Sequence, residues 1–401
     1  MPEITSSATE ASSTRAEFFR ALGPVFFFFF VAGVATVMLG PLLPALIRRW
    51  HIQDNQAGTL FTVSFAGQLC GAWFATRDLR RSVLCGACMT AVGCMWMVWA
   101  DFNLAHVALF CVGLGLGLGL TAGNVIVGTA MPHARTRLLA MLNVSWGVGA
   151  IACPLLVRAC GRDRVHLFFL VLSSFLILAT VLTLAIPRTA SRTIAEALST
   201  ETSPKEEDAT LKKMPLPLRP LLMFSGAMLL FVGIENALGG WLPSYGIRTA
   251  MGLRASSIAL YFWVAELSGR LLLAALTSLF GEATLYRASI FLLIFTEAAL
   301  IIAAHLGAGG VAMLTILSGL ALAPIYPLML SFFLARTGNH PRLGPVFAAA
   351  SLGGATLPWL TGVVSTQFHG LRYGLLVPAA GAVLLLLLSP EITARPTKQG
   401  T

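Results

Sequence analysis

The sequence predicts an all-α membrane protein with twelve transmembrane helices, arranged as two six-helix pseudo-symmetric halves. Three observations lead to this prediction: the composition, the length of the apolar segments and a repeat between the two halves. Hydrophobic residues make up 57% of the 401-residue chain, and charged residues only 11%. A soluble domain carries about 25% charged residues. Most of the surface of this protein is therefore expected to face lipid.

The apolar segments have the length that an α-helix needs to cross a bilayer, about 20 residues. Spans of a membrane β-barrel would alternate in polarity, and the sequence shows no such alternation. In the first half we expect spans at 22–47, 55–76, 83–100, 106–131, 139–160 and 166–187. In the second half we expect spans at 218–246, 255–279, 287–305, 309–335, 343–365 and 371–389. These segments predict a multi-pass protein of the cell inner membrane.

Polar segments divide the chain and set its expected orientation. Residues 188–217 carry charges and no apolar periodicity, so we interpret them as a solvated linker between the halves 22–187 and 218–389. Residues 1–21 and 390–401 are expected to be polar tails. If both tails are cytoplasmic, eighteen Lys and Arg residues lie on the inner side and eight on the outer side. Because positive charge concentrates in cytoplasmic loops, the N-terminus, the linker and the C-terminus are predicted to be inside.

The two halves repeat the same motifs in the same order. Gly40-Pro-Leu-Leu-Pro44 corresponds to Gly239-Gly-Trp-Leu-Pro243, at an offset near 200 residues. A second pair, which begins at Gly149 and Gly353, has a similar offset. Two six-helix repeats related by an axis along the membrane normal are a known transporter design, with the substrate near mid-membrane between the repeats.

Four stretches carry a resemblance to a known family. They are Phe231-Val-Gly-Ile-Glu235-Asn-Ala-Leu-Gly-Gly-Trp241-Leu-Pro, Phe262-Trp263-Val-Ala-Glu-Leu-Ser-Gly269-Arg270, Gly319-Leu-Ala-Leu-Ala-Pro324-Ile-Tyr-Pro327 and Ala72-Trp-Phe-Ala-Thr-Arg77-Asp-Leu-Arg80-Arg81. The first three resemble the seventh, eighth and tenth helices of the fucose-permease-like sugar:proton symporters in the major facilitator superfamily. The fourth resembles a degraded copy of the loop signature of that superfamily. The resemblance implies a sugar transporter driven by protons. It also implies an acidic residue in the first helix, and the segment 31–46 contains none.

Acidic residues inside membrane spans are costly and usually mark ion or substrate pathways. Glu235, beside Asn236, is expected either to bind substrate hydroxyls or to take up the coupling proton, the alternative being a protonated structural carboxyl. Glu266 and Arg270 are four residues apart, in the order that favours a helical pair. That pair is either structural or opens when substrate or a proton arrives. We interpret Glu297, in a peripheral helix, as a packing residue.

Sugar sites combine aromatic faces with a few fixed hydrogen-bonding groups. Residues of both kinds fall within or near the predicted spans, and the repeat places Asn124 opposite Tyr326. Each aromatic side chain has the alternative role of packing or of anchoring at the membrane interface. The further candidate substrate-binding residues are Gln68, Asn124, Asn143, Trp146, Trp241, Trp263 and Tyr326.

Several other functions are not expected. The glycine-rich run 113–119 lies inside an apolar helix, so we interpret it as a helix-packing surface rather than a nucleotide loop. The histidines form no metal-ligand pattern, and no catalytic residue set is recognised. The net charge of +10 sits mainly in short loops, where it sets topology rather than binding nucleic acid. We therefore predict no enzyme activity and no cofactor.

The sequence thus predicts a monomeric secondary active transporter that moves a sugar or similar small polar solute by alternating access. The predicted coupling ion is a proton, with sodium as the alternative. A drug or metabolite exporter of the same fold is a second interpretation, because an apolar cavity with one acid would also suit it. A membrane sensor or receptor that does not transport is a third.

Overall fold

The computed structural model describes residues 22–75, 78–130, 135–161, 164–184, 218–302, 307–337 and 344–394. Within these ranges the regular structure is helical, with no strand. The first half comprises the helix Leu22–Val37 followed by α2 (Leu39–Trp50), α3 (Asp54–Phe74), α4 (Leu79–Trp99), α5 (Phe102–Ala130), α6 (Arg135–Cys160) and α7 (Val165–Leu184). The second half comprises α10 (Leu218–Thr249), α11 (Ala255–Leu279), α12 (Glu282–Ile302), α13 (Ala308–Leu322), α14 (Ile325–Thr337), α15 (Gly344–Gln367), α16 (Leu371–Gly374) and α17 (Leu376–Thr393).

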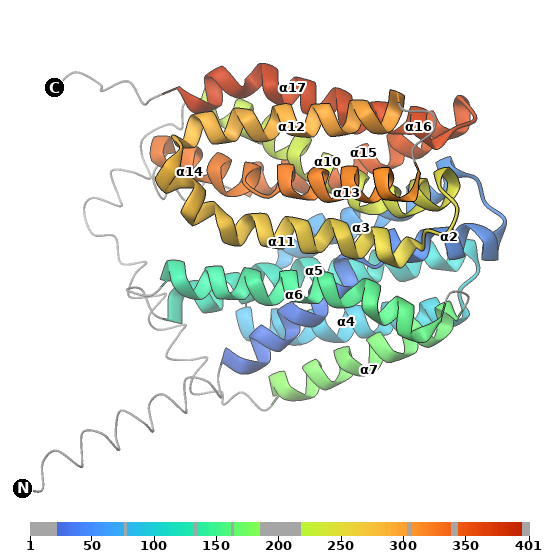
Figure 1. Cartoon of the computed structure of the whole chain (residues 1–401). Helices are drawn as coiled ribbons and strands as arrows, with labels where there is room; N and C mark the ends of the chain where they lie inside the picture. The colour runs from blue at the N-terminus through green and yellow to red at the C-terminus, as the bar shows by residue number, and fades with distance from the viewer. Residues whose placement is uncertain are drawn as a thin grey trace, which may run out of the picture.

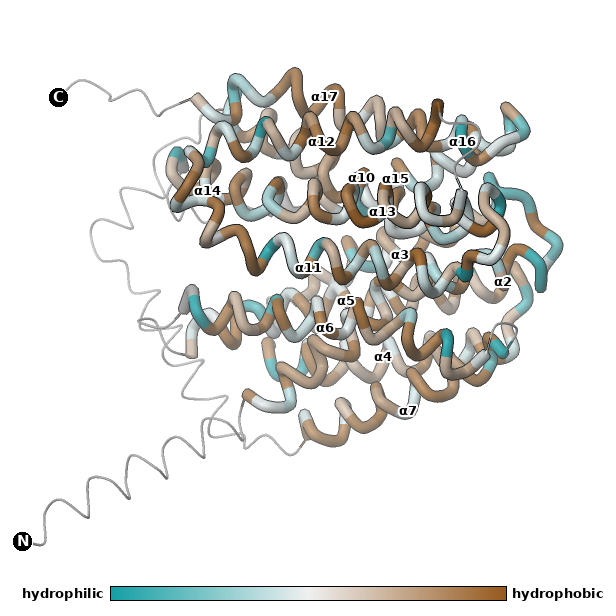
Figure 2. Tube along the Cα trace, viewed as in Figure 1, coloured by the Kyte–Doolittle hydropathy of each residue, from teal (hydrophilic) through white to brown (hydrophobic). Residues whose placement is uncertain are grey.

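The helices form two bundles that lie side by side. Figure 1 shows α4, α5, α6 and α7 of the first half below the yellow-to-red helices of the second half, and α2 and α3 at about the height of α11, with most helix axes along one common direction. Hydrophobic residues dominate helices such as α7 and α17, whereas hydrophilic residues gather near the helix ends (Figure 2). This distribution fits helices whose outer faces contact lipid.

Most of the helices meet the requirements of a membrane span. Among the described residues, eight helices are long and apolar enough to cross a bilayer, or nine if the bent pair Leu22–Val37 and Leu39–Trp50 is one span. The helices α3, α11 and α15 have comparable lengths. They lie between the halves: α3 packs against α15, and α11 packs against α2 and α6, so these three helices face the other half.

The first predicted span is one apolar run that bends by 44° where Leu22–Val37 meets α2. Pro41 has no backbone N–H to continue the helical hydrogen bonding, which explains the break. Beyond the bend, α2 approaches α10 so closely that a Cβ on Gly40 would lie 2.3 Å from the carbonyl oxygen of Gly239. The glycines of the repeated motif therefore allow the backbones of the two halves to touch.

The observed boundaries differ from the predicted ones at the end of the chain. The last helix continues to Thr393, beyond the predicted limit at 389. Glu391 stabilises this extra turn through an ion pair with Arg219, and Arg336 donates to the carbonyl of Ile392 at 3.0 Å. The predicted linker 188–217 and the tail 1–21 lie outside the described residues.

Candidate functional site

Three ionisable side chains meet between α10 and α11. Arg270 donates from Nη2 to Oε1 of Glu235 at 2.8 Å, and the same nitrogen donates to Oε1 of Glu266. Glu266 is 2% exposed, and the side chain of Glu235 is 12% exposed. We call Glu235, Glu266 and Arg270 the Arg270 triad. With both carboxyls ionised it carries one net negative charge, in a position where charge is costly unless it is paired.

One face of α11 presents polar atoms that have no partner. Nε1 of Trp263, Oε2 of Glu266 and Nε of Arg270 are buried and make no hydrogen bond with the protein. The three residues are three and four positions apart, so they lie on one side of the helix. Buried polar groups are normally satisfied. This face therefore offers two donors and one acceptor to a polar molecule that enters between the halves.

Trp263 meets the first half through Trp146 of α6. The two rings are perpendicular, with centroids 6.0 Å apart, and a Cβ on the neighbouring Gly147 would lie 2.9 Å from a methyl carbon of Leu267. Asn143 precedes Trp146 by one helical turn, so both lie on the side of α6 that approaches α11. Its side chain is exposed and donates to the carbonyl of Leu139 at 3.0 Å. The structure thus brings Trp146, Trp263 and Asn143 to one region.

Other candidates of the second half lie around this region. Asn236 follows Glu235 and donates to the carbonyl of Val232 at 2.8 Å. Tyr326 packs its ring against Phe231, with centroids 5.7 Å apart. Trp241 is fully buried farther along α10, where its indole N–H donates to the carbonyl of Pro358 at 2.8 Å. Trp241 therefore takes part in the packing of α10 against α15.

The first half contributes two further candidates. Asn124 on α5 is exposed and donates to the carbonyl of Leu120 at 2.9 Å. Gln68 on α3 is half-buried, and its backbone packs against the glycines of α5, since a Cβ on Gly117 would lie 2.1 Å from the carbonyl oxygen of Gln68. Asn124 and Tyr326, which the repeat places at matching positions in the two halves, make no described hydrogen bond to each other. Each makes its described contacts within its own half.

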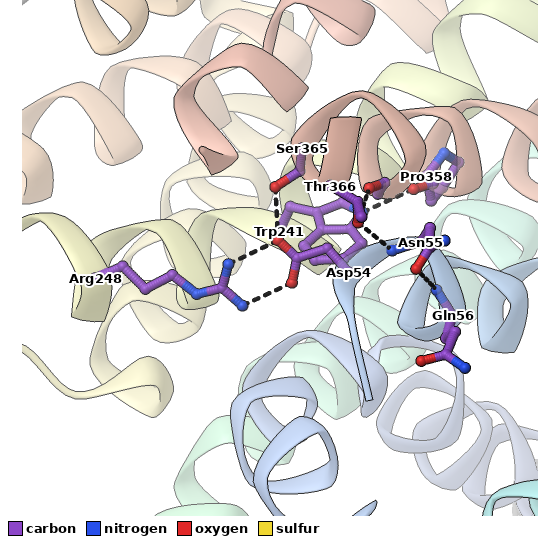
Figure 3. Close-up of polar contacts among 9 residues, drawn as sticks. Asp54, Asn55, Gln56, Trp241, Arg248, Pro358, Ser365 and Thr366 are labelled. Carbon is purple, nitrogen blue, oxygen red and sulfur yellow. Dashed lines mark hydrogen bonds and ion pairs between the residues drawn. The ribbon is translucent and has the colours of Figure 1, made fainter. Parts of the chain in front are cut away.

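Sequence reasoning missed an ion pair between the halves. Arg248 at the end of α10 binds both carboxylate oxygens of Asp54 at the start of α3, at 2.7 and 2.8 Å. Ser365 of α15 donates to the same carboxylate at 2.6 Å. Figure 3 shows the guanidinium reaching the carboxylate beside the Trp241 ring. We call Asp54, Arg248 and Ser365 the Asp54 cluster. Only the position of Asp54 and Arg248 near span ends hinted at it.

Several hydrogen bonds and ion pairs between the halves lie toward the end of the bundle that holds the Asp54 cluster. The amide of Asn55 donates to Thr366 at 2.9 Å, and Thr62 donates to the carbonyl of Ala355 at 2.8 Å. The hydrogen bonds and ion pairs of Asp54, Asn55 and Thr62 to the second half all start from the first three turns of α3. The halves are therefore bonded to each other at one end of the bundle.

Glu297 on α12 is fully buried away from the Arg270 triad. Neither carboxyl oxygen has a hydrogen-bond partner. Its neighbour Thr296 accepts a hydrogen bond from Ser318 of α13 at 3.1 Å, which places this part of α12 inside the second half. A charged carboxylate without a partner is strongly disfavoured there, and this favours the neutral form of Glu297.

Comparison with known proteins identifies the fold and its family. The family model for the Major Facilitator Superfamily matches residues 25–342. The Bypass of stop codon protein 6 of Saccharomyces cerevisiae is 25% identical over 407 residues, covering 92% of this chain and 80% of that protein. The Glucose/mannose transporter GlcP of Bacillus subtilis is 23% identical over 352 residues, covering 84% of this chain and 85% of that protein.

Solved structures share the fold. A POT family transporter crystallised with 5-aminolevulinic acid matches with a TM-score of 0.74 and 14% identity, over 94% of this chain and 97% of that one. The transporter FucP in its outward conformation matches with a TM-score of 0.60 and 17% identity, over 93% and 98%. Since the family model matches well over half of the sequence, the chain belongs to the Major Facilitator Superfamily and is a membrane transporter rather than an enzyme.

Proposed function

We propose that this transporter is a proton-coupled carrier of a sugar or similar small polar solute, working by alternating access. The observation that carries the proposal is the polar face of α11, where Trp263, Glu266 and Arg270 each have a buried polar atom without a partner. A polyol supplies donors and acceptors for such atoms, and the aromatic pair Trp146 and Trp263 supplies an apolar surface for a sugar ring. The sugar transporters among the relatives support this substrate class.

We place twelve helices across the inner membrane, with both termini and the linker inside. This count adds α3, α11 and α15 to the helices that are long and apolar enough to cross a bilayer. Their polar side chains are tolerated because they face the other half rather than lipid. The excess of Lys and Arg in the predicted cytoplasmic segments supports the orientation. On this assignment the Asp54 cluster lies at the outer end of the bundle.

Alternating access then follows from where the halves are joined. With the outer end closed by the Asp54 cluster, the polar face of α11 is approached from the cytoplasmic end. Rocking of one half against the other would separate Asp54 from Arg248 and expose the same face to the outside. Gln68, Asn124 and Asn143 would contribute hydrogen bonds from the first half, while Asn236 and Tyr326 contribute from the second.

Coupling to protons rests on the charge of the Arg270 triad. The triad has one net negative charge when both carboxyls are ionised and none after one takes up a proton. The neutral state costs less to move into a dry environment. Proton uptake and solute binding therefore favour the same closed, occupied state. The proton gradient can then drive accumulation of the solute.

Uptake of labelled sugars into proteoliposomes, with and without an imposed pH gradient, tests the proposal. We expect at least one sugar to accumulate only when the gradient is present. Efflux of lipophilic cations with no sugar uptake would favour the exporter, and sugar binding without any flux would favour a receptor. A sodium gradient replacing the pH gradient identifies sodium as the coupling ion.

A further inference from the structure

A cavity lies at the Asp54 end of the bundle, away from the polar face of α11. Its volume is about 790 Å³, and it is lined by the ends of α10, α12 and α15 and by the segment around α16. We call it the vestibule. Its charged side chains are Asp54, Arg248 and Arg372, and His369 also lines it. Ligand cavities commonly have volumes of about 300–1,000 Å³, so the vestibule is large enough for a small solute.

The charges in the vestibule do not cancel. Asp54 is fully engaged, because Arg248 binds both of its oxygens and Ser365 donates to one of them. Arg372 has no carboxylate within ion-pair distance in the described part of the chain. The vestibule therefore contains one cation in excess, and a cation in a concave surface attracts an anion.

Arg372 is held in place although it lacks an acidic partner. Its Nη2 donates to the hydroxyl of Tyr373 at 2.6 Å, and its guanidinium carbon lies 4.6 Å from the centroid of the same ring. Contact with the aromatic face restrains the guanidinium. The remaining N–H groups keep the planar fork that binds a carboxylate with two hydrogen bonds. Arg372 is thus a restrained guanidinium with no acidic partner in the described part of the chain.

We propose that the vestibule binds a small hydroxylated organic carboxylate, with its carboxylate on Arg372. Hydroxyl groups of the ligand are met by polar side chains of the lining, among them Gln53, Thr249 and Thr366. The vestibule is a site distinct from the polar face of α11. Binding of the carboxylate there does not depend on coupling of transport to protons.

Binding in the vestibule also acts on the Asp54 cluster. A carboxylate in this cavity competes with Asp54 for the guanidinium of Arg248, since both residues line it. Removing the charge of Asp54 leaves Arg248 free and adds a second cation for the ligand. The variant D54N is therefore expected to bind the carboxylate more tightly, whereas loss of Arg372 weakens binding.

Isothermal titration of the purified full chain in detergent, at constant chloride, tests the proposal. Gluconate and sorbitol are matched probes, because they differ mainly in a carboxylate against a hydroxymethyl group. We expect gluconate to bind at least about tenfold more tightly than sorbitol. R372Q should weaken gluconate binding by about tenfold, and D54N should strengthen it several-fold. The control R254Q removes an exposed arginine outside the vestibule lining, at the start of α11.

Three outcomes would overturn the proposal. Equal binding of gluconate and sorbitol, or binding of neither, would remove the carboxylate preference. Equal losses in R372Q and R254Q would show a general effect of surface charge. Arginine-dependent binding of short-chain phosphatidylglycerol without binding of gluconate would assign the cation to a lipid headgroup. If R372Q does not fold, a failure of D54N to strengthen gluconate binding contradicts the proposal by itself. Sugar uptake is measured separately. A failure of the vestibule proposal can therefore be told apart from a failure of the proposed transport function.

Discussion

Arg270 of α11 and Glu235 of α10 are joined by a hydrogen-bonded ion pair, with Nη2 2.8 Å from Oε1. The same guanidinium holds Glu266, one turn before it on α11. Glu235 is 35 residues from Arg270 in the sequence, so its carboxyl ties two helices together. The pair is partly exposed, whereas Glu266 is almost completely buried. Glu235 is therefore the carboxyl of the triad that a proton or a solute reaches more readily.

Replacing Glu235 by glutamine is expected to uncouple transport from protons. The glutamine amide oxygen can still accept the hydrogen bond from Arg270, but the side chain no longer exchanges a proton. Uptake driven by a pH gradient should fall by about a hundredfold or more, the scale on which a proton-transferring side chain contributes. Exchange of labelled for unlabelled solute, which needs no net proton movement, should persist. Both are measured in proteoliposomes.

The matched control for this variant is E297Q. Glu297 is also a buried acid in a membrane helix, but neither of its oxygens has a partner and it lies outside the triad. Glutamine has nearly the shape of an uncharged glutamate, so gradient-driven uptake should stay within about twofold of the wild type. Equal losses of uptake in E235Q and E297Q would show that the triad has no special role in coupling.

The unpartnered indole N–H of Trp263 is predicted to bind the solute directly. The variant W263F keeps an aromatic surface against Trp146 but removes the N–H donor together with part of the ring. The loss of one hydrogen bond to the solute should raise KM by about tenfold, equivalent to about 1.4 kcal/mol, with little change in kcat. Initial rates of uptake over a range of solute concentrations measure both constants.

Trp241 provides the contrast for that experiment. Its N–H already donates to the carbonyl of Pro358, so W241F leaves a backbone carbonyl of α15 without its partner. We expect W241F to lower the thermal stability of the purified protein more than W263F does, because only W241F also removes a hydrogen bond to the backbone. An unchanged KM in W263F would place the solute elsewhere.

Much of the fold follows from the sequence, because span length and repeated glycines are local properties. The motif containing Gly40 and its counterpart at Gly239 predicted two related halves, and the two glycines meet in the structure. The Glu266–Arg270 pair was also predicted, since a spacing of four residues places both on one helical face. The resemblance to the major facilitator superfamily is confirmed by the family match.

Long-range pairing was not predictable in the same way. Asp54 and Arg248 are 194 residues apart, and the sequence around each residue does not identify the other as its partner. The attachment of Glu235 to Arg270 likewise depends on how α10 packs against α11. The polar contacts between α3 and α15 also depend on tertiary structure: the backbone amide of Asn55 donates to Thr366, and Thr62 donates to the carbonyl of Ala355.

The close approach of α2 to α10 allows a steric test of how the two halves close at the Asp54 end. A methyl group on Gly40 would lie 2.3 Å from the carbonyl oxygen of Gly239, so G40A should push the two helices apart. Transport should be lost, and reactivity of a cysteine introduced at buried Phe61 toward a maleimide should rise several-fold.

The control for this test is G226A on α10. A Cβ at Gly226 would meet no atom within 4 Å. The substitution should leave transport intact and change stability by no more than about 1 kcal/mol. Normal transport in G40A, together with an unchanged labelling rate, would mean that closure at this end does not require the contact between α2 and α10.

Proton movement caused by the solute tests the central claim most directly. A pH-sensitive dye inside proteoliposomes reports the pH of the lumen. A transported sugar is added outside, with no imposed pH gradient. The account predicts that the lumen acidifies as the sugar enters the wild-type vesicles, and that E235Q vesicles show no such change. Sugar entry without acidification in the wild type, or equal acidification in E235Q, would contradict it.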